Sequence, residues 1–144
     1  MKILVDRIVG ERLFLAAREN EMGRYRGLTL RVLDKAAPAM GPGKAELIDR
    51  IGQTGSISAA ARAMGMSYRR AWQLVEALNS TFTQRVVVTA IGGIKGGGAR
   101  VTAFGERLVS LFHAMEGKAS AAIAADLRRF TGYLRPPLKR RKRR

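Results

Sequence analysis

The chain has 144 residues, of which 47% are hydrophobic, so it is long enough for one domain with a buried core. Lysine and arginine number 27 against 11 aspartate and glutamate, and the net charge of +16 favours a polyanionic partner, with nucleic acid ranked before an anionic membrane surface. The absence of cysteine excludes disulfides, thiolate metal sites and a cysteine nucleophile, and it is compatible with a reducing cytoplasm.

The N-terminal part of the sequence carries weak signals. Residues 1–27 mix charges with a short apolar run, so we expect either a weak helix or, in preference, a disordered leader. The apolar patch at the start is too short for a signal peptide or a membrane span, so we expect a cytoplasmic protein without a membrane partner. Alternating apolar residues predict a strand over 28–34, and the proline and glycine cluster at 37–43 is expected to end it.

Three helices are predicted in the middle of the chain. Apolar residues share one helical face over 44–53, and a second, short helix follows a cap at Ser56 or Ser58. A third helix is capped by Ser67 and runs from 68 to about 79. The short glycine-containing connection between the last two helices predicts a helix-turn-helix.

A β-hairpin is predicted after these helices. Residues 85–90 are rich in β-branched side chains, residues 100–102 can pair with them, and the glycine-rich stretch 92–98 is the link. This hairpin would be a wing. The glycine run has neither the ending of a P-loop nor the spacing of a dinucleotide fingerprint, so a nucleotide site is not expected.

One long helix is predicted from Thr102 to about Phe130, because apolar residues recur there every three or four positions. A helix of about 28 residues would be about 40 Å long, which exceeds a small domain and indicates dimerisation. The fold class expected is therefore mainly α with a small β wing, a winged helix-turn-helix with a long C-terminal dimerisation helix. The chain divides into a leader at 1–27, this domain at 28–130 and a basic tail at 131–144, expected to be disordered when free.

The expected DNA-contacting surface begins at the cap of the third helix. Arg69 and Arg70 occupy the first turn, where the helix dipole disfavours cations, and a bound phosphate would remove that conflict. In a helix-turn-helix this end faces DNA. The alternative is that both arginines are solvated and that Trp72 covers the edge of the core. The candidate DNA-binding residues are Ser67, Tyr68, Arg69, Arg70, Trp72 and Gln73 on this helix, with Lys95 and Arg100 in the wing.

The sequence shows no pattern of catalytic residues. His113 is the only histidine, so it cannot form a histidine cluster for a metal, and we expect it at the surface or an interface. The acidic residues are scattered singly and offer no acid–base pair. We therefore expect neither an enzyme nor a metal site.

Spaced blocks of sequence resemble a known family. GSISAAA at 55–61 and GMSYRRAW at 65–72 resemble the helix-turn-helix of the ModE molybdate-responsive regulators and, more distantly, of the LysR type. The similarity continues in order through residues 77–79, 92–99, 101–102 and 105–108, and it covers roughly 28–130. The resemblance implies a winged-helix fold, dimerisation through the first and last helices, and operator binding by residues 67–73 and the wing.

The resemblance also implies what to expect of cofactors and partners. ModE regulators usually continue into molybdate-binding modules, which are absent from this sequence, so no cofactor is expected and the effector is open. The hypothesis is a homodimeric, sequence-specific regulator that binds double-stranded DNA, linked to molybdenum or another metal. One alternative is a nonspecific basic nucleic-acid-binding or architectural protein. Another is a module whose long apolar helix docks a partner protein.

Overall fold

The structure is a computed structural model that describes residues 2–9, 27–35, 37–91 and 98–135, with the backbone alone described for the first of these ranges. The tip of the predicted wing, most of the predicted leader and most of the basic tail lie outside the described residues. In chain order the elements are β1 (Lys2–Val9), β2 (Gly27–Asp34), β3 (Ala37–Met40), α2 (Pro42–Thr54), α3 (Ile57–Ala63), α4 (Tyr68–Thr81), β4 (Val87–Thr89), β5 (Ala99–Val101), α5 (Ala103–Ala122) and α6 (Ala124–Thr131).

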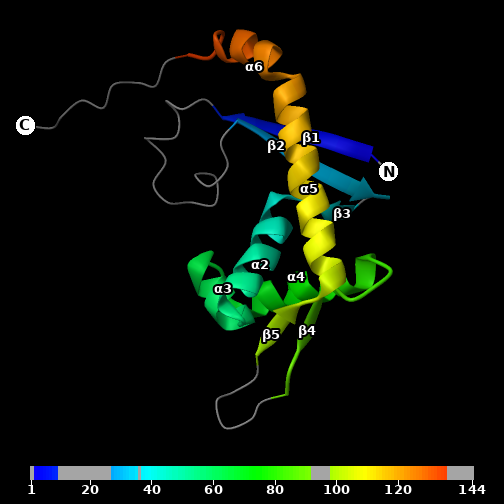
Figure 1. Ribbon diagram of the computed structural model, residues 1–144. Coiled ribbons are helices and arrows are strands. Elements are labelled where there is room, and N and C mark those ends of the chain that lie inside the picture. The colour runs from blue at the N-terminus through cyan, green and yellow to red at the C-terminus, as the bar shows by residue number, and fades with distance from the viewer. Residues whose placement is uncertain (1, 10–26, 36, 92–97, 136–144) are drawn as a thin grey trace, which may run out of the picture.

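The elements form two neighbouring units joined by α5. Strands β1, β2 and β3 make an antiparallel sheet in that order. Helices α2, α3 and α4 cluster on one side of that sheet, and the β4–β5 hairpin extends away from them (Figure 1). Helix α5 starts at the hairpin and packs against both α2 and β2. Three helices with a hairpin after α4 are the winged helix-turn-helix that the sequence predicts, and α5 is the predicted long C-terminal helix.

The core is centred on α2. Its Leu47, Ile48 and Ile51 side chains are at most 1% exposed, and they belong to one hydrophobic cluster with Leu78 of α4 and Phe112 of α5. Burial of such side chains stabilises a fold by about 1.5–3 kcal/mol each. The same cluster includes residues of β2, β3, α3 and the hairpin, so one continuous core holds these elements together with α2, α4 and α5.

The predicted caps lie at the helix starts. The Oγ atoms of Ser56 and Ser67 each accept a hydrogen bond of 3.1 Å from the backbone N–H three residues later, and the Thr102 hydroxyl accepts one of 3.0 Å from Gly105. Between α3 and α4, Gly65 has φ of 66°, a left-handed conformation that glycine adopts without strain. These local signals explain why the predicted helix positions are confirmed.

The interpretation of residues 1–27 as a weak helix or disordered leader is wrong for residues 2–9. These form β1, which pairs with β2 from Lys2 opposite Leu33 to Val9 opposite Gly27. The register shifts between Val5 and Arg7, so an irregularity interrupts the period-two pattern by which a strand is normally predicted. The division of the chain into leader, domain and tail remains a prediction.

The proline and glycine cluster at 37–43 also holds a strand, contrary to the expectation of a breaker. Strand β3 is the edge of the sheet, where a proline such as Pro38 is tolerated because no further strand needs its N–H. Helix α2 then begins with Pro42 in its first turn, which is the favoured position for proline in a helix.

The single long helix predicted to Phe130 is wrong, because α5 ends at Ala122 and α6 begins at Ala124. Ile123 has φ of −108° and ψ of 8°, outside the helical range, although neither glycine nor proline marks this position. A Cβ atom on Gly27 would lie 3.9 Å from Leu127 Cδ2, so the bend carries α6 over the start of β2 (Figure 1). Helical periodicity does not reveal this break. No helix in the described ranges is long and apolar enough to cross a membrane.

Helix α5 approaches the hairpin closely at Gly105. An added Cβ there would lie 2.5 Å from Val86 O and 2.8 Å from Val101 Cγ1, which is too close for either atom. We predict that Gly105→Ala lowers the free energy of unfolding by about 1–3 kcal/mol, measured by urea denaturation. Gly117→Ala on the same helix is the matched control, because nothing lies within 4 Å of that Cβ. It should raise stability by about 0.5–1 kcal/mol, and equal losses in both variants would contradict the packing described.

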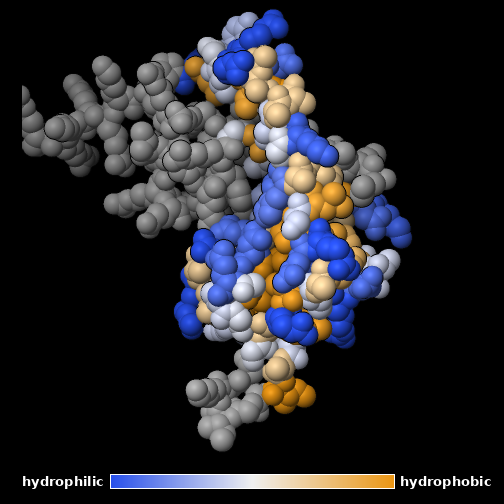
Figure 2. Space-filling view, in the orientation of Figure 1, coloured by the Kyte–Doolittle hydropathy of each residue, from blue (hydrophilic) through white to orange (hydrophobic). Residues whose placement is uncertain are grey.

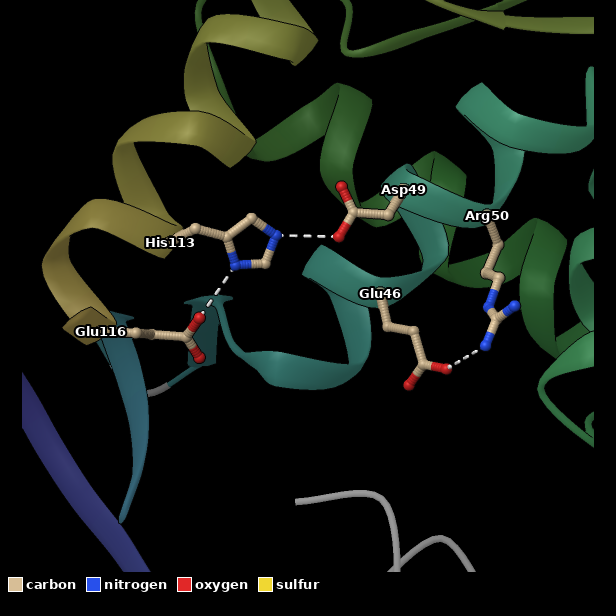
Figure 3. A network of polar contacts seen from close by, with 5 residues as sticks. All are labelled: Glu46, Asp49, Arg50, His113 and Glu116. Atoms are coloured by element: carbon tan, nitrogen blue, oxygen red, sulfur yellow. Dashed lines mark hydrogen bonds and ion pairs between the residues drawn. The ribbon is translucent and has the colours of Figure 1, made fainter. Parts of the chain in front are cut away.

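His113 links α5 to α2 (Figure 3). Its Nε2 lies 2.8 Å from Asp49 Oδ2 and its Nδ1 lies 2.9 Å from Glu116 Oε2. The hydrogen bond with Glu116, opposed by partial burial and assisted by the bond with Asp49, raises the pKa of His113 above its ordinary value. This surface position agrees with the prediction. The sequence does not predict the contact with Asp49, because Asp49 is 64 residues away along the chain.

The raised pKa of His113 fixes the sign of a pH effect. Protonated imidazole stabilises the fold fully below its ordinary pKa, and this contribution is lost as the pH rises through the higher folded-state pKa. We therefore predict that His113→Gln destabilises the protein at pH 5.5 more than at pH 8.5, by less than about 1 kcal/mol because the contacts are partly exposed. Thermal melts of both proteins at the two pH values measure it. A larger loss of stability at pH 8.5 than at pH 5.5 would contradict a raised pKa of His113.

Candidate nucleic-acid interface

Helix α4 has a buried face and an exposed face. Ala71, Val75 and Leu78 are at most 1% exposed and fix the helix on the core. At 100° per residue, Arg69 and Gln73 project opposite this buried stripe, and both are exposed. The outward face of the first two turns therefore presents a guanidinium and an amide to an external partner.

Two aromatic residues flank this outward face on the side of the hairpin. The rings of Tyr68 and Trp72 stack with centroids 6.4 Å apart and an interplanar angle of 22°. Tyr68 is 56% exposed and Trp72 is 37% exposed, so Tyr68 lies mainly in solvent while most of the Trp72 surface is covered by protein. Both residues line a cavity of about 350 Å³ between α3, α4 and the hairpin, together with Ser58 and Thr89.

Arg70 lies on the other flank of α4. Its neighbour one turn on is Leu74, and both residues line a separate cavity beside α2. The predicted residues of α4 all lie near the start of the helix but face three directions. The aromatic pair faces the hairpin, Arg69 and Gln73 face outward, and Arg70 faces α2. The Ser67 side chain caps the helix by accepting from Arg70 N–H.

The hairpin is anchored beside the same end of α4. Val87 pairs with Val101, and Arg100 lies exposed in β5. Ala99 N–H donates to Gly55 O at 2.9 Å, so the turn between α2 and α3 supports the hairpin. Lys95, the other wing residue predicted, lies outside the described residues.

The Asn79 side chain has a structural role that the sequence analysis does not predict. Its Oδ1 accepts from the N–H groups of Val86 and Val87 at 2.8 and 3.1 Å, and its Nδ2 donates to Val87 O at 2.9 Å. The side chain therefore ties the last turns of α4 to the start of the hairpin. An asparagine just inside a helix end is the available sequence signal, because such a residue favours bonds to nearby backbone.

We predict that Asn79→Ala lowers the free energy of unfolding by about 1–3 kcal/mol, since it leaves backbone groups of Val86 and Val87 without this partner. Urea denaturation measures the change. Ser80→Ala is the control, because the Ser80 hydroxyl bonds only within its own helix, and it should change stability by less than about 0.5 kcal/mol. Equal losses of stability in the two variants would contradict a role of the Asn79 side chain in holding the hairpin against α4.

The surface around this interface is strongly polar. Arg62, Arg69 and Arg70 are exposed on α3 and α4, and Arg100 is exposed in the hairpin. Hydrophobic surface gathers in the middle of the molecule along α5 and also at the described end of the hairpin (Figure 2), where Ile91 is fully exposed. Among the described residues no cluster of histidine and acidic groups could hold a metal ion. The chemistry offered here is recognition of an anionic, hydrogen-bonding partner.

Comparison with known proteins supports homology over part of the chain. The molybdenum-pterin-binding protein MopB of Rhodobacter capsulatus is 46% identical over 85 residues, which is 59% of this chain and 32% of MopB. The transcriptional regulator ModE of Yersinia pestis is 41% identical over 71 residues, which is 49% of this chain and 27% of that protein. The DNA-binding transcriptional dual regulator ModE of Escherichia coli K12 is 38% identical over the same length and covers the same shares. These matches confirm the resemblance to ModE, and none of these names denotes an enzyme.

The matches span about a third of the length of these curated relatives or less. No family model matches the chain. Among solved structures, ArgP from Mycobacterium tuberculosis aligns with 60% of this chain and 31% of its own, with a TM-score of 0.42 and 25% sequence identity.

Proposed function

We propose that this chain, homologous to ModE regulators over about half of its length, is a transcriptional regulator that binds a specific double-stranded DNA sequence as a homodimer. The observation that carries the proposal is the outward face of α4. Arg69 and Gln73 project there between an exposed aromatic pair and Arg70, next to a basic hairpin. This arrangement fits insertion of the helix start into a major groove.

The proposed recognition assigns different roles to the aspects of α4. Arg69 can bind guanine O6 and N7 with two hydrogen bonds, and Gln73 can bind adenine in the same way. The Tyr68–Trp72 pair offers apolar surface to a sugar or a thymine methyl group. Ser67, Arg70, Arg100 and Lys95 are proposed to contact phosphates and so to position the helix.

The proposed dimer uses the apolar surface of α5 and the segment after it. Leu111 is 60% exposed, Phe130 is 55% exposed and Tyr133 is 86% exposed, which is unusual for large hydrophobic side chains. A two-fold dimer would present two copies of α4 to DNA, so the operator should be approximately palindromic. The names of the relatives, which mention molybdenum and DNA binding, support regulation linked to molybdenum. A cytoplasmic location is part of the same proposal.

A second candidate function is nonspecific nucleic-acid binding, and the net charge of +16 favours it. Sequence preference separates the two candidates. A specific regulator should prefer its site over competitor DNA by about a thousandfold or more, and an architectural protein should not.

Selection of random double-stranded DNA by the purified full chain tests the proposed function. The expected result at near-physiological salt is enrichment of one approximately palindromic motif. Strong binding without enrichment would support the nonspecific candidate, and no binding would contradict both functions.

Substitution of Arg69 tests the reading role on the selected site. Arg69→Ala should lose about 1–3 kcal/mol of binding free energy on the selected sequence and should relax the preference at one base pair. Fluorescence anisotropy with the selected duplex and single-base variants measures both effects. Lys35→Ala, which removes an equal charge from the exposed turn between β2 and β3, is the control. An equal loss on every sequence would show that Arg69 contacts phosphate instead of a base.

A further inference from the structure

A second cavity lies on the side of α4 that faces away from the hairpin. It has a volume of about 300 Å³ and is formed by β2, the start of α2, and α4. Three cationic side chains line it, one from each of these elements, namely Arg31, Lys44 and Arg70. None of the described residues that line the cavity is acidic. The cavity is therefore a concave site of single charge sign within the fold.

Lys44 is held at this cavity by the neighbouring strand. Its Nζ donates to Pro38 O at 2.7 Å and approaches Ala39 O at 3.4 Å. An ammonium group has three N–H donors, so these contacts leave at least one for a further acceptor. Burial, and then the positive charge of Arg70, lower the pKa of Lys44, which shows that the two cations act on each other across this site.

Arg31 and the start of α2 bring further positive charge to this cavity. The Cγ atom of Arg31 lies 3.3 Å from the position that a Cβ on Gly41 would take, so the arginine stem packs over the start of α2. Helix α2 has no side-chain cap and no acidic residue in its first turn. Its dipole therefore adds a positive potential at the first residues of α2, which line the cavity.

We propose that the cavity lined by Arg31, Lys44 and Arg70 binds a tetrahedral oxyanion of the phosphate class. Three converging cations in one concave site favour a single multivalent anion, because charge-assisted hydrogen bonds from several donors can then meet one group. Two sources share this chemistry, a phosphodiester of the DNA backbone and a free inorganic oxyanion.

The DNA source rests on the proposed function and deepens it. If Arg69 and Gln73 enter the major groove, the aromatic pair and the hairpin flank one side of α4 and this cavity flanks the other. A phosphate bordering the groove would then lie at Arg70 and Lys44, so the protein would hold the backbone on both sides of the helix.

The test uses the full chain with Lys44→Met and, as a second variant, Arg70→Gln, because Arg70 is exposed and can be replaced without opening the core. Lys35→Met is the matched control, because Lys35 is exposed in the turn between β2 and β3 and does not line the cavity. Duplex binding is measured from low to near-physiological salt, and inorganic phosphate is titrated calorimetrically into each DNA-free protein. Thermal melts confirm that each variant is folded.

A DNA phosphate in the cavity predicts that the slope of log affinity against log salt falls by about 0.9 in Lys44→Met and Arg70→Gln and stays unchanged in Lys35→Met. A free oxyanion predicts saturable phosphate binding that both cavity variants lose and the control keeps. Salt slopes and phosphate binding that are the same in all three variants would overturn the site. If the wild-type chain binds no DNA, the proposed function fails, and the phosphate titration still decides this inference.

Discussion

The interface depends on the position of the hairpin against α4, and the Asn79 side chain fixes that position. Its amide meets three backbone groups at Val86 and Val87, both of which are at most 1% exposed. Thr102 completes the junction, since its hydroxyl donates to Arg85 O at 2.7 Å while it caps α5. One small polar junction thus sets the end of α4, the start of the hairpin and the start of α5.

The recognition surface follows from that geometry and from the burial of one face of α4. Because Ala71 and Val75 are held in the core, the remaining aspects of the helix have fixed directions. Arg69 projects outward, Trp72 projects toward the hairpin, and Arg70 projects toward Lys44. DNA binding in this orientation therefore requires no rearrangement of the described helices, and the aromatic pair and the cationic cavity on either side of α4 have distinct proposed roles.

Local signals made much of this structure predictable from sequence. The caps at Ser67 and Thr102 and the left-handed Gly65 mark helix boundaries through bonds that span a few residues, so the helix-turn-helix and the candidate residues of α4 could be predicted. Features that depend on distant contacts could not. The cavity joins Arg31 to Arg70 across 39 positions of the chain, given by 70 − 31, and the break at Ile123 has neither a glycine nor a proline to mark it.

The central claim is that α4 enters the major groove of a specific site, and the chain contains no cysteine, which permits labelling at one chosen position. Ser80→Cys places a thiol on the outward aspect of α4, beyond the proposed contacts, and Lys35→Cys in the turn between β2 and β3 serves as the control. Each thiol carries an iron–EDTA group that cleaves nearby DNA. On the selected duplex, the account predicts two symmetry-related zones of major-groove cleavage from position 80 and weaker cleavage from position 35. Uniform cleavage along the duplex from position 80, or cleavage no stronger than the control, would contradict it.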